Sequence, residues 1–120
     1  MVFLYLHFKP RNMKNEFGIV LYNIENDDCL NGVWINPDSK NVIRNEIAKR
    51  IRKGKDGIDG SYLCSYIEWR NVIVNGTLEI TLRSGYYEFY WTDNSDPKNN
   101  FEGNGYRMND KQIAVYYKPI

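Results

Sequence analysis

The sequence predicts an all-β protein, an antiparallel meander barrel of eight or nine strands with one short helix near residues 41–53. Three observations lead to this fold class. Residues 77–82 (TLEITL) alternate polar and apolar side chains without interruption, as a strand with one solvated face requires. Asn75-Gly76 follows the β-branched run 72–74, which predicts a type I′ hairpin turn. Strand-like segments recur about every ten residues, a spacing typical of barrels and sandwiches.

Strands are expected wherever aromatic or β-branched residues cluster between polar turns. In chain order these segments are 2–8, 17–24, 30–34, 72–74, 77–82, 86–91, 101–106 and 112–117, with further strand-forming residues from Gly60 onward. Of the polar connections between them, the segment 93–100 (DNSDPKNN) is expected to be a long loop. Tyr62, Leu78, Ile80, Phe89 and Trp91 are expected to point into the barrel.

Residues 41–53 are ambiguous. Ile43, Ile47 and Ile51 are four apart, Gly54 stands where a helix C-cap would, and the last turn is basic, which together favour a helix. The same three positions would also share one face of a strand, so a strand is the alternative.

Length and charge restrict the class of protein. A chain of 120 residues is expected to form one domain, residues 1–120, and 42% hydrophobic residues suffice for a packed core. A net charge of +1 argues against nucleic acid and membrane partners. Because residues 1–8 lack the basic start and cleavage site of a signal peptide, we expect a cytoplasmic protein; export with a signal peptide absent from this chain is the alternative.

Catalytic and metal-binding chemistry has few candidates. One histidine, His7, and two cysteines argue against a zinc site or a nucleophilic triad, so no metal, cofactor or enzymatic activity is predicted. Glu79 and Glu88 could form a paired-carboxylate site across a hairpin, although we expect both to face water. Cys29 and Cys64 are expected to be free thiols, with one disulfide as the alternative.

One charge run stands out between residues 49 and 55. It holds five basic residues and no acid, which suggests a site for a phosphate or another anion. The candidate anion-binding residues are Lys49, Arg50, Arg52, Lys53 and Lys55. The alternative is a solvated segment balanced by Asp56 and Asp59.

An ordered set of short elements covers most of the chain. It comprises 18–22 (GIVLY), 30–34 (LNGVW), 60–62 (GSY), 76–80 (GTLEI), 87–91 (YEFYW), 101–105 (FEGNG) and 113–116 (IAVY). This order resembles bacterial avidin-like and lipocalin-like barrels of the calycin type, many of unassigned function. The resemblance implies a barrel in which Trp34, in the Gly-x-Trp element, plugs one end.

Aromatic residues make up 15% of the chain and would either fill the barrel or line a ligand cavity. The leading prediction is therefore a non-enzymatic binding module with a small-molecule ligand inside the barrel. Its expected lining is Trp34, Tyr62, Tyr66, Trp69, Tyr87, Trp91 and Tyr106. The first alternative is a protein-interaction or homo-oligomerisation barrel with a filled core, using its outer surface or a terminal strand, 2–8 or 112–117. The second is a nucleotide or anion binder using residues 49–55.

Overall fold

The computed structural model describes residues 17–26, 28–37, 42–67 and 71–120 of the chain. Within them lie eight strands: β1 (Gly18–Asn26), β2 (Cys29–Ile35), β3 (Arg44–Lys53), β4 (Gly60–Ile67), β5 (Ile73–Leu82), β6 (Tyr87–Asp93), β7 (Asp96–Asn109) and β8 (Gln112–Pro119). The expected strand at 2–8, His7 and Trp69 lie outside the described residues.

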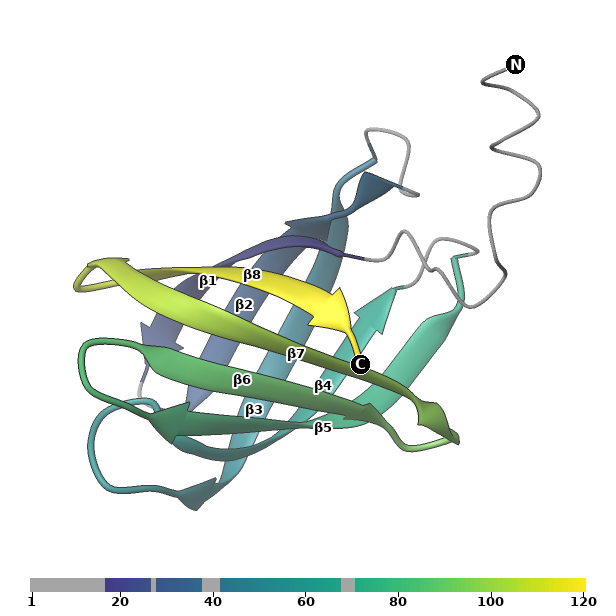
Figure 1. Ribbon diagram of the computed structural model, residues 1–120. Coiled ribbons are helices and arrows are strands. Elements are labelled where there is room, and N and C mark those ends of the chain that lie inside the picture. Colours follow the sequence, from purple (N-terminus) through teal and green to yellow (C-terminus); the bar gives the residue numbers. More distant parts are fainter. Residues whose placement is uncertain (1–16, 27, 38–41, 68–70) are drawn as a thin grey trace.

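The eight strands form a closed antiparallel barrel in simple meander order (Figure 1). Each strand pairs with its neighbour in sequence, and β8 closes the ring by pairing with β1 from Gly18↔Tyr117 to Asn23↔Gln112. The predicted all-β meander barrel is confirmed, with eight strands in the described part of the chain. Because β8 is hydrogen-bonded to both β7 and β1, the 112–117 segment presents no free edge.

The two ends of the barrel differ. At the terminal end, the described chain enters at Phe17 and leaves at Ile120, and strands β2, β4 and β6 end there at Ile35, Ile67 and Asp93. The plugged end carries the turns after β1, β3, β5 and β7, and the connection 53–60 there inserts Ile58, only 2% exposed, into the core.

The helix expected near 41–53 is wrong, because residues 44–53 form β3. Glu46 and Ala48 point inward and are buried, whereas Ile47 and Ile51 point outward and are 40% and 60% exposed. A four-residue spacing keeps side chains on one strand face as well as on one helix face. Hydrogen bonding to β2 and β4 decided between the two, a long-range effect that local signals do not contain.

The hairpin turn expected at Asn75-Gly76 is also wrong, because β5 runs through it without a break. Gly76 sits in the ladder between Cys64 on β4 and Asp93 on β6. A Cβ atom there would lie 2.2 Å from the carbonyl oxygen of Thr92. The glycine therefore permits a close approach of two strands, which is its other common role in sheets.

The expected loop at 93–100 is shorter than predicted. It consists of Asn94 and Ser95, and β7 begins at Asp96. The carboxylate of Asp93 accepts hydrogen bonds from the Ser95 backbone and hydroxyl, both at 2.8 Å, and from the Asn99 amide at 3.0 Å. This side chain organises a tight turn in a sequence that reads as a long polar loop.

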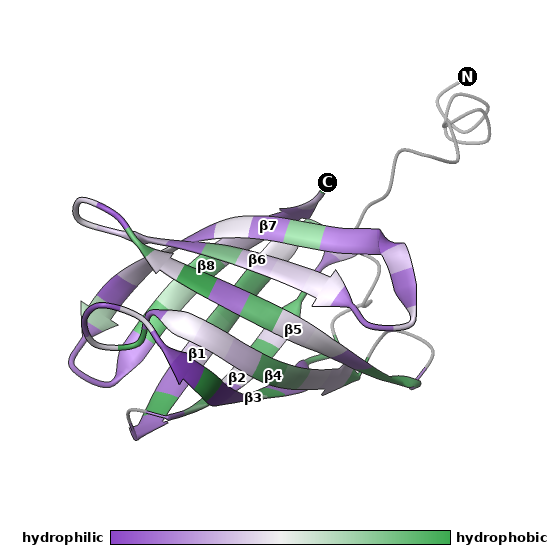
Figure 2. Ribbon diagram, turned by 90° about the horizontal axis from the view of Figure 1, so that it is seen from below, coloured by the Kyte–Doolittle hydropathy of each residue, from purple (hydrophilic) through white to green (hydrophobic). Residues whose placement is uncertain are grey.

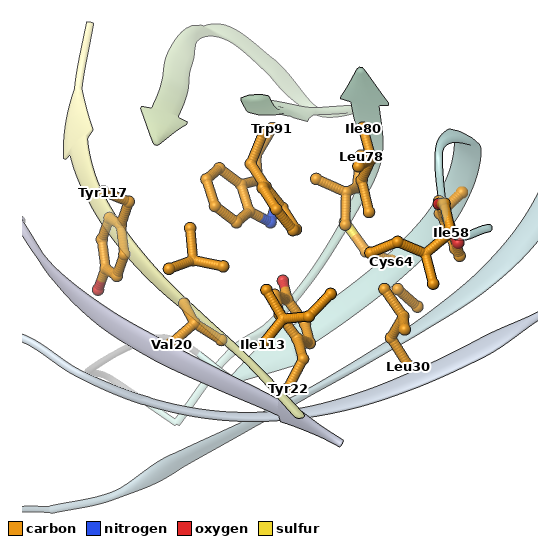
Figure 3. Close-up of a cluster of buried hydrophobic side chains, with 14 of the residues drawn as sticks. Val20, Tyr22, Leu30, Ile58, Cys64, Leu78, Ile80, Trp91, Ile113 and Tyr117 are labelled. Carbon is orange, nitrogen blue, oxygen red and sulfur yellow. Dashed lines mark hydrogen bonds between the residues drawn. The ribbon is translucent and has the colours of Figure 1, made fainter. Parts of the chain in front are cut away.

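The barrel interior is filled with side chains, and hydrophobic and hydrophilic residues alternate along the strands (Figure 2). The largest fully buried side chains are Tyr22, Leu30, Tyr62, Leu78, Phe89, Ile113 and Val115. All five residues predicted to point inward are buried, which confirms that expectation. Figure 3 shows side chains from opposite walls meeting on the barrel axis, with the indole nitrogen of Trp91 turned toward the hydroxyl of Tyr22.

Packing around Gly105 on β7 provides a test of how full the interior is. A Cβ atom there would lie 2.5 Å from Cε1 of Phe89 and 3.1 Å from Val115. Gly105→Val is therefore expected to destabilise the protein by about 1–3 kcal/mol in urea unfolding, despite the better strand propensity of valine. Ala114→Val, on the neighbouring strand with its side chain outward, is the control and is expected to change stability by less than about 0.5 kcal/mol. Unchanged stability in both variants would contradict a filled interior.

Candidate functional site

Six of the seven aromatic residues predicted to bind a ligand lie in the described part of the chain and divide into three groups. Trp34, Tyr62 and Trp91 are buried inside the barrel. Tyr66 and Tyr87 pack against the core and are partly buried. Tyr106 lies outside the barrel, 47% exposed and stacked on Tyr86 with ring centroids 6.0 Å apart.

A cluster of rings lies inside the barrel toward the terminal end. Trp34 meets Tyr66 and Tyr117 edge to face at centroid distances of 6.3 and 6.5 Å, and Tyr117 also contacts Trp91 and Phe101 at 5.9 Å. The prediction omitted Tyr117 and Phe101. The alternation Ile113, Val115, Tyr117 along β8 is the signal that could have placed Tyr117 inside.

A buried polar group lies at the centre of the barrel. The Tyr22 hydroxyl donates a short hydrogen bond to Oε2 of Glu46, and Nε1 of Trp91 donates to the same oxygen at 3.2 Å. Burial raises the pKa of Glu46 to about 7, although both hydrogen bonds act to lower it. Burial, with the adjacent Glu46 charge, also raises the pKa of Tyr22 well above its usual range. Glu46 therefore changes its protonation near neutral pH, inside the fold.

Glu46 was not among the predicted site residues, because a helix was favoured over a strand for residues 41–53. The signal that could have found it is the strand alternative, in which Glu46 shares a face with Ala48.

Both cysteines are free thiols: Cys64 is buried and Cys29 only partly so. Burial is the main cause of a strongly raised pKa at Cys64, so this thiol does not supply a nucleophilic thiolate.

The basic run 49–55 does not form one surface. The Arg50 side chain is only 4% exposed and donates to the carbonyl oxygens of Gly57 at 2.6 Å and Asp59 at 3.1 Å. It also forms an ion pair with Asp28 at 3.0 Å. These contacts tie the connection 53–60, with its buried Ile58, across the plugged end.

The other basic residues of the run face solvent. Arg52 contacts Ser61 at 2.6 Å and Glu79 at 3.3 Å, and its side chain is 66% exposed. Lys49, Lys53 and Lys55 are exposed. An anion site that uses these residues stays a prediction, and Arg50 would enter it only by giving up its contacts at the plugged end.

Glu79 and Glu88 lie on the outer wall but are not directly opposite each other. Glu79 pairs with Tyr90 in the ladder, and Glu88 pairs with Thr81. Their side chains are 42% and 44% exposed and bind Arg52 and Arg83, respectively. This arrangement matches the expectation that both carboxylates face water.

A groove of about 870 Å³ crosses the outer wall from β5 through β6, β7 and β8 to β1 and β2; we call it the lateral groove. One part is apolar and aromatic, with Phe17, Ile19, Ile35, Tyr90 and Tyr116 between 38% and 58% exposed. The other part carries three carboxylates, Glu79, Glu88 and Glu102, and, among the described lining residues, a single cation, Lys118. The groove thus joins an apolar surface to three carboxylates, each of which has a cationic partner.

Two negative findings apply to residues 17–26, 28–37, 42–67 and 71–120. Within these ranges no three histidine, cysteine or acidic side chains gather closely enough to hold a metal ion. None of these residues belongs to a helix long and apolar enough to span a lipid bilayer.

The closed eight-stranded antiparallel meander is compatible with calycin-type folds. Comparison of the chain with protein families, curated proteins and solved structures found no match.

Proposed function

We propose that the protein is a non-enzymatic binding module that holds a ligand with an apolar body and a cationic group in the lateral groove. The observation that carries this proposal is the juxtaposition of exposed aromatic and aliphatic side chains with three carboxylates along one groove. Its volume of about 870 Å³ falls within the range of ligand pockets.

The packed interior supports a site on the outer wall. Tyr22, Tyr62 and Phe89 are at most 1% exposed and occupy the space in which an interior ligand would lie. The outer wall offers Tyr116, 54% exposed, whose hydroxyl accepts a hydrogen bond from the Asn104 amide at 2.9 Å. A half-exposed tyrosine of this kind provides a rigid apolar surface for a ligand.

The carboxylates that line the groove indicate which class of ligand it would bind. Of the three carboxylates, Glu102 pairs with Lys118 at 3.6 Å within the groove, whereas Glu79 and Glu88 pair with Arg52 and Arg83, which are not among the described lining residues. Because the groove presents the carboxylates while Arg52 and Arg83 lie outside its described lining, we expect a cationic ligand group to bind there in preference to an anionic one. Because the carboxylates are partly solvated, their contribution is expected to be modest and to fall with added salt.

The test uses two fluorescent probes that share one aromatic body and differ in a trimethylammonium or a sulfonate group. In a fluorescence titration, the trimethylammonium probe is expected to bind more tightly than the sulfonate probe. Tyr116→Ala is expected to weaken binding of the trimethylammonium probe about tenfold, or about 1.4 kcal/mol. Glu102→Gln is expected to reduce the difference in binding affinity between the two probes.

Tyr106→Ala is the matched control, since Tyr106 is an outward tyrosine of similar exposure that is not part of the groove lining. Equal binding of the two probes, or an equal loss in Tyr106→Ala and Tyr116→Ala, would refute a ligand site in the lateral groove.

A second candidate is a ligand at the aromatic cluster of the terminal end, as the leading sequence prediction holds. The supporting observation is Nε1 of Trp34, which is buried and has no hydrogen-bond acceptor among the described residues. An unpartnered buried donor is costly, so a ligand that supplies an acceptor atom there would remove that cost. Native mass spectrometry of the gently purified protein is expected to reveal such a ligand, and Trp34→Phe to lose it; an unliganded mass for the wild type counts against this candidate.

A further inference from the structure

The described chain enters the barrel at the lateral groove itself. Phe17, the first described residue, is 53% exposed and belongs to the groove lining. Ile19 follows two residues later on β1, also points outward and lines the same groove. The sixteen residues that precede Phe17 are therefore covalently attached at the edge of this groove.

The apolar part of the groove contains a continuous cross-strand row, which we call the apolar row. It consists of Ile35 on β2, Ile19 on β1 and Tyr116 on β8, in which Ile19 is the ladder partner of both others. All three side chains point outward and are at least 38% exposed. Neighbouring exposed apolar side chains of this kind mark a surface that binds an apolar partner.

Three partly exposed carboxylates, Glu79, Glu88 and Glu102, continue the groove beyond the apolar row. Tyr116 pairs in the ladder with Asn104 on β7, and Asn104 pairs with Glu88 on β6. The side chains of the three carboxylates are between 42% and 49% exposed. Each forms one ion pair within the chain, but a carboxylate has about four acceptor positions, so a second cation can still bind.

The sequence of residues 1–16, which precede the described part of the chain, matches both parts of the groove. Residues 1–8 (MVFLYLHF) are apolar or aromatic apart from His7. Residues 9–16 (KPRNMKNE) contain three cations, Lys9, Arg11 and Lys14, and one acid, Glu16. An apolar run is thus followed by a basic one, within reach of a groove that joins apolar side chains to carboxylates.

We propose that the lateral groove binds the chain's own segment 1–16 and that this segment regulates access to the groove. Apolar side chains of residues 1–8 cover the apolar row, and the cations of residues 9–16 lie near the carboxylates. The regulatory role rests on the ligand site proposed above, because the segment and an external ligand of the same chemistry compete for one groove.

The length of the segment is sufficient for this contact. The groove crosses six strands that lie about 4.8 Å apart, so it is roughly 24 Å across. The eight residues 9–16 span up to about 26 Å when extended. Residues 1–8 can therefore return over any part of the groove.

Covalent attachment explains why a small surface is enough. A segment joined to the edge of its own binding site has an effective concentration on the order of millimolar there. A contact too weak to hold a second copy of the chain at micromolar concentration therefore holds the attached segment. Occupancy of the groove is expected to be independent of protein concentration.

Limited digestion of the full chain with trypsin measures how much of the segment is bound. The bonds after Arg11 and Lys14 are accessible to the protease only while the segment is out of the groove. Cleavage at these bonds is expected to be about tenfold faster in Ile19→Ser, and in Leu4→Ser combined with Leu6→Ser, than in the wild type.

The matched control on the barrel is Ile51→Ser. Ile51 points outward on β3 and is 60% exposed, as Ile19 is 58% exposed, but it does not line the lateral groove. Cleavage of this variant at the wild-type rate is expected. Equal rates in the wild type and Ile19→Ser would overturn the proposal. Protection that increases with protein concentration would also overturn it, since the groove would then bind the segment of a second copy.

The trimethylammonium probe distinguishes this proposal from the ligand site. The probe is expected to bind about tenfold more tightly to the Leu4→Ser and Leu6→Ser double variant than to the wild type, because the segment no longer competes. Asn12→Ser, a polar substitution in the same segment, is expected to bind the probe like the wild type. Equal binding of the probe to the wild type and the double variant would refute the competition. A probe that binds no variant would refute the ligand site, while the digestion still decides whether the segment occupies the groove.

Discussion

Replacing Glu46 with glutamine is expected to stabilise the protein by up to about 3 kcal/mol at pH 8 and to change its stability little at pH 4.5. The pKa of Glu46 is raised from an ordinary 4.5 to about 7 in the folded protein, mainly by burial. The folded state therefore holds this proton more tightly than the unfolded chain does. The stability contributed by this group is fully present below pH 4.5 and is lost as the pH rises to about 7. Above the pKa of the folded protein, the free energy of unfolding no longer changes with pH because of this group. Glutamine keeps an oxygen to accept from Tyr22 and Trp91 but does not ionise.

Urea unfolding followed by tryptophan fluorescence between pH 4.5 and 8 measures this effect. Asp93 does not interfere: burial acts to raise its pKa, but hydrogen bonds from Asn99 and Ser95 outweigh it and hold the pKa below its ordinary value. Its contribution is lost only below about pH 4. His7 is replaced by glutamine in every protein compared, so that no imidazole titrates within the window. The same pH slope with and without the Glu46→Gln substitution would show that the buried carboxyl does not titrate as described.

Arg50→Met is expected to destabilise the protein by about 2–4 kcal/mol. The substitution leaves the carbonyl oxygens of Gly57 and Asp59 without their donor, and Asp28 without its cation. The backbone amides of Lys55 and Asp56, which donate to the Asp59 carboxylate at 2.7 and 2.9 Å, are expected to exchange faster with deuterium. Urea unfolding and hydrogen exchange of the 53–60 connection measure the two effects.

Arg52→Met provides the comparison, because Arg52 is two residues away on the same strand, with a side chain 66% exposed. Its ion pair with Glu79 at 3.3 Å is solvated, so the expected loss is below about 1 kcal/mol. Similar losses in the two variants would mean that Arg50 does not secure the plugged end.

The sequence was informative where one face of a strand is uniformly apolar. Leu78 and Ile80 on β5, and Phe89 and Trp91 on β6, are buried as their alternation indicates. Local reasoning failed at Gly76, where a glycine next to asparagine is typical of a turn but serves a close contact with Thr92 on another strand. It failed also at Glu46, because a carboxyl on the buried face of a strand contradicts the hydrophobic pattern by which strands are recognised. The lateral groove was not predicted, since it depends on which outward side chains become neighbours around the closed ring.

The pairing of β1 with β8 has a consequence for synthesis of the chain on the ribosome. Seven of the eight strand pairs in the described barrel join neighbours in sequence and can form as soon as both strands have emerged. The eighth must wait, because Gln112 follows Asn23 by 89 residues. At about 5–20 residues per second, β1 has one unpaired edge for roughly 5–20 s. During that interval the nascent chain is an open sheet. Until β8 pairs with it, the free edge of β1 can form hydrogen bonds with a strand of another chain.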